Sequence, residues 1–288
     1  MNMLKYVVGG REVYNKCINY YLKTHPYKNV DTKDLLIAFE EVTGMQLDWF
    51  FEEWIYKGGE PEYHVKFDEA NGNSVFIVMQ VQELSEVTGL PVQGENALNS
   101  VNTDQFVGNT DSVDYRPAGL WKMPIWFEVH YTDETVDKKL VWIEKQTEVV
   151  KLPNPLGKKI DYVLFDPNNE VMKSVLFEKS FDMLQSQAMK ATNMLDRYDA
   201  LEAMRDIDVK KKRDFLIQQF DKEKWGAVKN EIVNQLLRDK NPKSYDLIRK
   251  AIAGKDALVQ KNIIQSTTAV PGELLPDYEK LLHGASYE

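Results

Sequence analysis

The chain has 288 residues, a formal net charge of −9, and 43% hydrophobic and 28% charged residues, a composition typical of soluble globular proteins with two or three domains. The acidic balance argues against a nucleic-acid partner, and no apolar run approaches the roughly 20 residues that span a bilayer, so we expect no transmembrane segment. The single cysteine, Cys17, excludes an internal disulfide.

Four short helices are predicted in the first 59 residues. The clearest covers residues 11–24 and ends before Pro26, and Asp31 is placed to cap the next one, which Gly44 closes. Cys17 falls on the apolar face of its helix, so we expect a small buried hydrophobe rather than a reactive thiol. The broad apolar faces of these helices indicate the flank of a larger bundle.

The stretch from Leu47 to Pro61, LDWFFEEWIYKGGEP, is predicted to form one helix with a single apolar stripe. This stripe runs through the following positions: Leu47, Phe50, Phe51, Trp54 and Ile55. Lys57 suits the negative end of the helix, and Gly58 is expected to adopt the left-handed capping conformation. The stripe is interpreted as core; a ligand pocket is the alternative.

Alternating apolar and polar residues indicate a β region from residue 61 to about residue 178. Asn71, Gly72 and Asn73 form the predicted turn of a first hairpin. The pattern predicts seven or so strands, including residues 63–67, 74–82, 123–131, 140–143, 147–152, 160–165 and 171–177. The last two are expected to pair with each other across residues 166–169. The long polar segment 84–119 is either functional or disordered.

From Phe181 onward the pattern is helical throughout, with successive amphipathic helices but no exact sequence repeat. This pattern predicts an α-solenoid of the HEAT type. The chain starts within a helical pattern and ends without an obvious polar cap. We therefore expect a truncated chain whose cut faces, at Met3, Val7 and Phe50 and at the final helices, expose apolar surface.

A resemblance to a known family is carried by Leu47, Asp48, Phe50, Phe51, Trp54, Gly59 and Pro61. These residues resemble the DL-x-x-FF-x-x-W-x-x-x-x-G-x-P segment of zinc aminopeptidases of the aminopeptidase N type. The segment of residues 2–29 looks similar to the family's segment just after its catalytic tyrosine. Residues 164–170 look similar to the hairpin that closes its β-sandwich, and residues 196–204 resemble the first helix pair of its C-terminal domain.

This resemblance implies an α+β multidomain fold. Residues 1–59 would be the helical C-terminal end of a thermolysin-like catalytic domain, 60–178 an Ig-like antiparallel β-sandwich, and 179–288 a HEAT-like helical repeat domain, truncated at its end. It also implies that the family's zinc site lies upstream of this segment. No catalytic or metal-binding residue is therefore expected in this chain, and its substrate-binding residues are unknown.

The residues themselves agree with that expectation. A zinc peptidase needs two histidines one turn apart on a helix, a glutamate between them and a further acidic ligand. The four histidines, His25, His64, His130 and His283, are too scattered for this motif. His64 and His130 lie at polar-facing strand positions, where a metal site is the alternative to plain surface residues.

Two charged clusters leave alternatives open. Asp133, Glu134 and Asp137 form an acidic turn that is either solvated or a calcium site, although it lacks the ligand spacing of a dedicated calcium loop. The basic run of residues 210–213 is interpreted as a solvated helix start, with phosphate binding as the alternative.

The main hypothesis is that the chain is the non-catalytic C-terminal portion of a zinc aminopeptidase, which shapes and closes the substrate cleft. The resemblance implies that the whole enzyme uses zinc as its cofactor and acts on peptide substrates, and that the missing N-terminal catalytic region is the partner of this chain. It also implies that this fragment alone is inactive. The alternative is a zinc-less scaffold that binds a protein partner through the β-sandwich and the solenoid.

Overall fold

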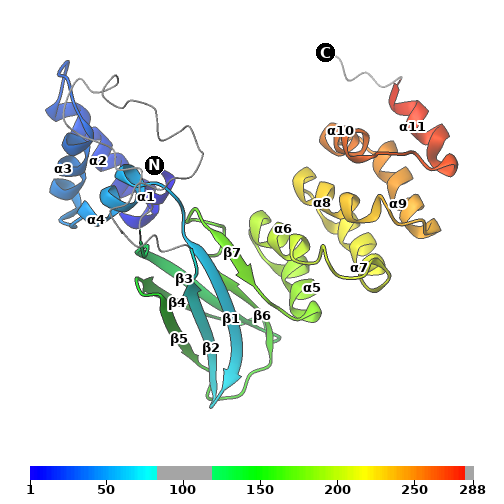
Figure 1. The fold of residues 1–288 in the computed structure, drawn as a ribbon, viewed down its shortest axis with the longest axis horizontal. Coiled ribbons are helices and arrows are strands. Elements are labelled where there is room, and N and C mark those ends of the chain that lie inside the picture. The colour runs from blue at the N-terminus through cyan, green and yellow to red at the C-terminus, as the bar shows by residue number, and fades with distance from the viewer. Residues whose placement is uncertain (83–118, 283–288) are drawn as a thin grey trace, which may run out of the picture. The chain divides into compact units, whose positions relative to one another are not determined.

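The computed structural model describes residues 1–82 and 119–282 and separates into two compact units (Figure 1). The first unit comprises residues 1–127, 138–157 and 170–178, and the second comprises 128–137, 158–169 and 179–288. No helix in the described ranges combines the length and apolarity needed to cross a lipid bilayer. The predicted segment 84–119 lies outside the described residues, apart from Gly119.

The first unit begins with the predicted helical region. Its helices are α1 (Asn2–Val7), α2 (Arg11–Thr24), α3 (Thr32–Thr43) and α4 (Asp48–Phe51). The caps of α3 are confirmed, because Asp31 and Asp34 exchange backbone-to-carboxylate hydrogen bonds of 2.9 and 3.0 Å, and Gly44 is left-handed at φ 68°. Cys17 is fully buried, as expected for a small hydrophobe.

The prediction of one regular helix from Leu47 to Lys57 is wrong. After α4 the chain continues as a five-residue π-helix, η1 (Glu52–Tyr56). Because a π-turn holds one residue more than an α-turn, the apolar stripe rotates: Phe50 and Phe51 are buried as predicted, but Ile55 is 41% exposed. The left-handed residue after the helix is Gly59, at φ 95°, rather than Gly58.

A four-stranded sheet in the first unit has the order β5-β2-β1-β7. Its strands are β1 (Glu62–Ala70), β2 (Asn73–Gln80), β5 (Thr147–Pro153) and β7 (Ser174–Phe177). The predicted hairpin between β1 and β2 is confirmed, with Asn71 and Gly72 both at positive φ, as a tight hairpin turn requires. The outward and inward alternation of β2 is regular, with Phe76 and Val78 fully buried.

A three-stranded sheet has the order β4-β3-β6, formed by β3 (Met123–Tyr131), β4 (Val136–Ile143) and β6 (Ile160–Phe165). The predicted pairing of residues 160–165 with 171–177 is wrong. β6 joins this sheet, whereas β7 lies parallel to β1, so the four-stranded sheet is mixed rather than purely antiparallel. The Ser174 N–H donates to the Pro61 carbonyl at 3.0 Å, and the Phe177 ring lies 6.2 Å from that of Phe76, so β7 gains its core contacts beside β1.

The helices of the second unit form consecutive antiparallel pairs (Figure 1). They are α5 (Phe181–Lys190), α6 (Met194–Glu202), α7 (Val209–Lys222), α8 (Gly226–Leu236), α9 (Pro242–Ala253), α10 (Ala257–Ser266) and α11 (Leu275–Leu282). Helix α8 contacts both α6 and α10, while α9 contacts both α7 and α11. One continuous apolar core, which includes Leu201, Leu216, Ile232 and Ile248, runs through the series. Every pair therefore buries its apolar stripe against the next pair.

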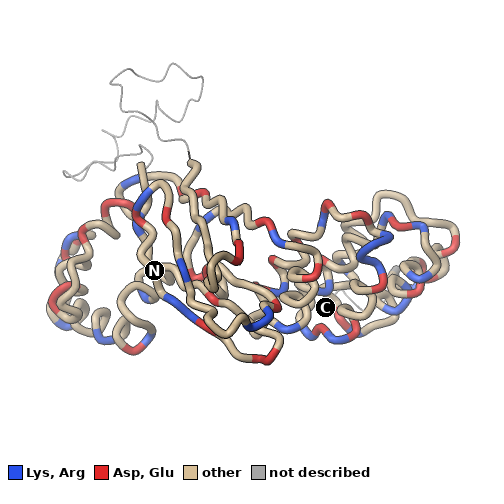
Figure 2. Tube along the Cα trace, turned by 90° about the horizontal axis from the view of Figure 1, so that it is seen from below, with Lys and Arg blue, Asp and Glu red and all other residues tan. Residues whose placement is uncertain are grey.

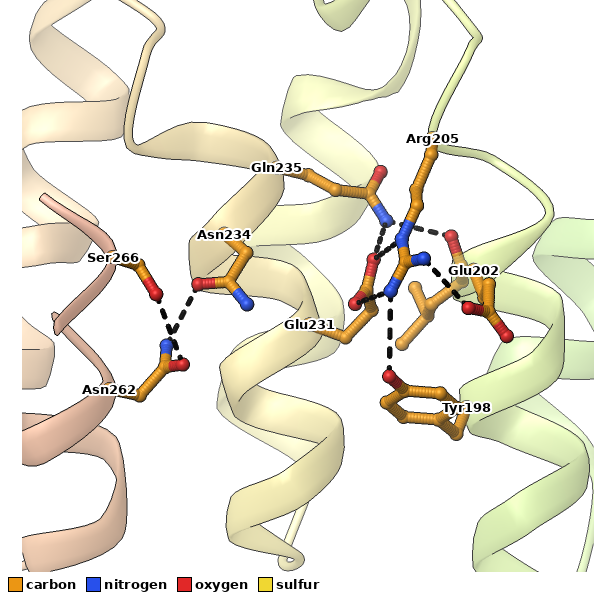
Figure 3. A network of polar contacts seen from close by, with 9 residues as sticks. Tyr198, Glu202, Arg205, Glu231, Asn234, Gln235, Asn262 and Ser266 are labelled. Carbon is orange, nitrogen blue, oxygen red and sulfur yellow. Dashed lines mark hydrogen bonds and ion pairs between the residues drawn. The ribbon is translucent and has the colours of Figure 1, made fainter. Parts of the chain in front are cut away.

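Three arginine–carboxylate pairs connect successive helix pairs at a constant separation of 26 residues. Each arginine donates two hydrogen bonds to its acid, and the pairs are Arg197–Glu223, Arg205–Glu231 and Arg213–Asp239. Figure 3 shows Arg205 between Glu231, Glu202 and the Tyr198 hydroxyl. Such fork-shaped pairing is geometrically specific, so the pairs set the spacing between neighbouring helix pairs.

The acid of the middle pair is almost completely buried. Burial by itself raises the pKa of Glu231, but the hydrogen bonds from Arg205 and Gln235 outweigh burial and hold the pKa below its ordinary value. A carboxyl whose pKa is lowered by folding stabilises the folded chain above its unfolded pKa and loses that contribution as the pH falls.

We predict that Glu231→Gln lowers the free energy of unfolding of the helical region by about 1.5 kcal/mol at neutral pH, because Arg205 loses its buried counter-ion but stays half exposed to water. The measurement is urea unfolding followed by far-UV circular dichroism. The matched control is Lys243→Ala, which removes an exposed pair with Asp214 and should cost less than about 0.5 kcal/mol. The difference between Glu231→Gln and wild type should shrink as the pH falls below about 4; a constant difference would contradict this account.

Candidate functional site

The histidines do not form a metal centre. His64 is exposed on β1, and His130 lies on β3 of the other sheet. His130 Nε2 is 2.8 Å from a carboxylate oxygen of Glu128, and its ring stacks on Tyr162 at 4.2 Å. His25 caps the C-terminal end of α2, and its Nδ1 lies 3.1 Å from the Tyr21 carbonyl oxygen. His283 lies outside the described residues.

In the ranges that the structure covers, no group of three or more histidine, cysteine, aspartate or glutamate side chains could hold a metal ion. Two histidines one helical turn apart, which a peptidase zinc site requires, do not occur in the sequence. The residues of this chain therefore do not fit the zinc of the aminopeptidases.

The acidic turn is already supplied with donors from the protein. Asp133 accepts hydrogen bonds from the backbone and hydroxyl of Thr135 and pairs with Lys158 at 3.2 Å. The hydrogen bonds from Thr135 lower the pKa of Asp133. Asp137 accepts a 2.8 Å hydrogen bond from the Tyr131 hydroxyl. These contacts favour an internally paired turn over a calcium site.

The basic run of residues 210–213 is only partly solvated, so the prediction of a solvated helix start is wrong for two of its members. Lys212 is 2% exposed and donates to the carbonyls of Met204 and Arg205. Arg213 is paired with Asp239. Figure 2 shows acidic and basic residues interspersed along the helices. Lys212 and Arg213 are therefore engaged in contacts within the fold, so their charges do not form a phosphate site.

The helical array has shallow grooves between neighbouring helices but no convergence of catalytic groups in them. A groove of about 540 Å³ between α5 and α7 is lined by Asp182, Ser186, Lys190, Asp214 and Phe215, among others. Lys190 pairs with Asp161, and Asp214 pairs with Lys243. Two of the three charged residues in this groove, Lys190 and Asp214, therefore have partners in the protein.

Lys122 connects the first helices of the first unit to its strands. Its backbone N–H donates to a carboxylate oxygen of Glu53 at 2.8 Å. Its Nζ lies 5.8 Å from the ring centroid of Trp49 and 5.3 Å from that of Trp142, within the range of a cation–π contact. The Trp49 and Trp142 rings meet edge to face at 5.4 Å.

A second pair of indoles lies beside this contact, where Trp54 of η1 packs on Trp121 with ring centroids 4.3 Å apart. We call the group of Trp49, Glu53, Trp54, Trp121, Lys122 and Trp142 the tryptophan joint. Burial raises the pKa of Glu53 to about 7, and the hydrogen bond from the Lys122 N–H opposes that rise. The sequence analysis missed this joint, and the density of tryptophans in residues 49–54 and 121–142 is the signal that could have found it.

The predicted exposure at Met3, Val7 and Phe50 is wrong, because α1 is covered by other parts of the first unit. The Tyr6 hydroxyl donates to the Pro124 carbonyl at 2.9 Å, and the Met172 N–H lies 3.3 Å from the Met3 sulfur. Val7 and Phe50 are buried. In the final helices the expectation is confirmed, because Leu258 and Ile264 are 66% and 53% exposed.

The exposed apolar surface of the helical region lies on α2 and α3 instead. In α2 Cys17 is the one buried residue among fourteen, although the helix carries several large apolar side chains. We define the α2–α3 face by the exposed residues Tyr20, Leu22, Tyr27, Val30 and Ile37. Large apolar side chains that are exposed in this part of the chain are candidates for contact with a partner.

Comparison with known proteins gives a match to one protein family. Residues 1–54 match the Peptidase family M1 domain. A comparison with curated proteins gives no match. The family match confirms, over residues 1–54, the resemblance to M1-type zinc aminopeptidases.

Among solved structures, the fold is similar to that of the aminopeptidase A of Legionella pneumophila, solved in complex with aspartic acid. The match has a TM-score of 0.52 and 16% sequence identity, and it covers 98% of this chain and 30% of that chain. The chain thus spans about a third of the length of the Legionella protein. The match confirms the mixed α+β architecture.

We predict that the chain binds no zinc ion tightly, because residues 1–82 and 119–282 contain no group of three or more side chains that could hold a metal. Isothermal titration with zinc should give no stoichiometric heat in the micromolar range. Binding of one zinc per chain that disappears in His130→Asn would instead show a site built around His130 and Glu128. His64→Asn serves as the matched control, since His64 is exposed on the other sheet.

Proposed function

We propose that this chain is the non-catalytic C-terminal portion of an M1-type zinc aminopeptidase, which shapes and closes the cleft where N-terminal residues are removed from peptides. The observation that carries the proposal is the match of residues 1–54 to the Peptidase family M1 domain. The fold likeness to the Legionella aminopeptidase over 98% of the chain supports it.

The proposed domains follow the same reasoning. Residues 1–59 would form the helical end of the catalytic domain, 60–178 an Ig-like β-sandwich, and 179–288 a truncated HEAT-like solenoid. The two sheets, joined by the Phe76–Phe127 ring contact at 5.1 Å, support the sandwich. The constant 26-residue spacing of the arginine–carboxylate pairs supports a repeating helical domain.

In this proposal zinc and the peptide-cleaving residues belong to an N-terminal catalytic region, and that region is the partner of this chain. The α2–α3 face is its proposed docking surface. A helix with one buried residue contributes little to a core by itself, so a large apolar partner would stabilise it. This chain would contribute shape and rigidity, and the catalytic region would contribute the chemistry.

We predict that the chain alone, with added zinc, does not hydrolyse an aminoacyl chromogenic substrate above the rate of buffer. The same assay on a longer product that includes the coding sequence upstream of Met1 should show turnover, provided that this sequence encodes an HExxH motif. Substituted zinc ligands upstream would favour the scaffold alternative. Robust turnover by the 288-residue chain would contradict the proposal.

We predict that Leu22→Glu combined with Ile37→Glu abolishes association with a separately produced catalytic region, because both charges would have to be desolvated on docking. Both side chains are already exposed, at 61% and 46%, so the thermal stability of the isolated chain should change little. The matched control is Leu156→Glu, at a position that is 82% exposed and outside the α2–α3 face. Binding that survives the double substitution, measured by size-exclusion chromatography, would place the interface elsewhere.

A further inference from the structure

The strand β7 lies at one edge of the four-stranded sheet, whose order is β5-β2-β1-β7. One side of β7 is paired with β1, and no strand of the described ranges lies on its other side. An open strand edge is a template for pairing with another chain, so proteins normally protect it with charged residues, with proline or with a covering element. The protection of each edge strand therefore indicates where such pairing can occur.

The other edge strands of the two sheets are protected. Charged residues and proline interrupt β4 and β5, namely Asp137, Lys138 and Lys139 in β4 and Glu148, Lys151 and Pro153 in β5. Helix α5 packs on β6, and Lys190 of this helix pairs with Asp161. In contrast, the four residues of β7 are Ser-Val-Leu-Phe, without a charge or a proline. Its Val175 and Leu176 are 44% and 52% exposed.

The backbone of Val175 points toward this open edge. The Ser174 N–H donates to the Pro61 carbonyl at 3.0 Å, so Ser174 directs its backbone groups toward β1. Successive residues of a strand direct their N–H and C=O groups to opposite sides, so Leu176 also faces β1 and Val175 faces away from it. Within residues 1–82 and 119–282, no hydrogen bond reaches the N–H or C=O of Val175. One donor and one acceptor are thus available to another strand.

We propose that β7 is a dimerisation strand, which pairs antiparallel with β7 of a second copy of this chain and joins the two sheets into one. Val175 of one copy lies opposite Val175 of the other, and each N–H donates to the C=O of its counterpart. A two-fold axis relates the two copies, so the contact is closed and association stops at the dimer. This dimer does not depend on the proposed aminopeptidase function.

The charges that flank β7 favour a second copy in the antiparallel orientation. Lys173 precedes the strand and Glu178 follows it. Antiparallel pairing brings the Lys173 end of each copy to the Glu178 end of the other, whereas parallel pairing would bring like charges together. The strand between them is uncharged, so no charge is desolvated where the two edges meet. A second copy always carries this complementary pattern, which an unrelated extended peptide would have to match by chance.

The contact is short, so the dimer should be weak and should depend on concentration. Size-exclusion chromatography with light scattering should show the 288-residue chain shifting from monomer to dimer between about 2 and about 200 μM. Val175→Pro removes the N–H that faces away from β1, where an edge strand tolerates proline, and should weaken the dimer about tenfold or more. The matched control is Val175→Thr, which keeps the N–H and should keep the dimer.

Hydrogen exchange on the wild-type chain gives a second measurement, which does not depend on whether Val175→Pro folds. Protection of the Val175 amide should rise about tenfold over the same concentration range, while the Leu176 amide, which faces β1, should keep its protection. A chain that stays monomeric, with a Val175 amide that exchanges at the same rate throughout, would overturn the proposal and leave the edge to a different protein. A dimer that persists in Val175→Pro would also overturn it and would place the interface elsewhere, for example at the α2–α3 face.

Discussion

Aromatic burial at the tryptophan joint is the contact on which the first unit depends. Helix α4 and η1 are short, and neither would persist alone in water, since helices of this length are unstable without tertiary packing. Their aromatic side chains pack on Trp121, which lies just before β3, and on Trp142, which lies in β4. Full burial of a side chain of this size is worth about 2 kcal/mol, so Phe50, Phe51 and Trp54 together hold the segment on the strands.

The second unit is stabilised in a different way. Its apolar core is continuous through successive helix pairs, and the arginine–carboxylate pairs fix how far one helix pair is displaced from the next. Hydrophobic burial is not directional, whereas a two-bond arginine–carboxylate contact tolerates little change of distance or angle. Burial therefore provides most of the stability of the array, and the pairs define its geometry.

Most of the side chains that could carry chemistry in the described residues have structural partners instead. His25, His130, the acidic turn, Lys212 and Arg213 are engaged with neighbours inside the fold, and the described residues hold no group of three or more ligands for a metal. The family match is confined to residues 1–54, where the α2–α3 face remains exposed.

The sequence by itself determined the features that depend on neighbours in the chain. The capping residues Asp31 and Gly44, the turn at Asn71 and Gly72 and the alternation in β2 and β3 were all predictable, because each is set by local hydrogen bonds or by a repeating apolar pattern. The family resemblance also came from residues close together in sequence. These signals were sufficient for the mixed α+β architecture.

Only the tertiary structure decided what depends on distant residues. The parallel pairing of β7 with β1, the burial of Lys212 and the hydrogen bond of Glu53 depend on partners far away in the sequence, such as Pro61 for Ser174 and Lys122 for Glu53. A local pattern shows that a side chain is charged or apolar, but not which atoms will surround it. For that reason the sequence showed that this chain has no zinc motif, and the fold alone revealed the carboxyl group in the tryptophan joint.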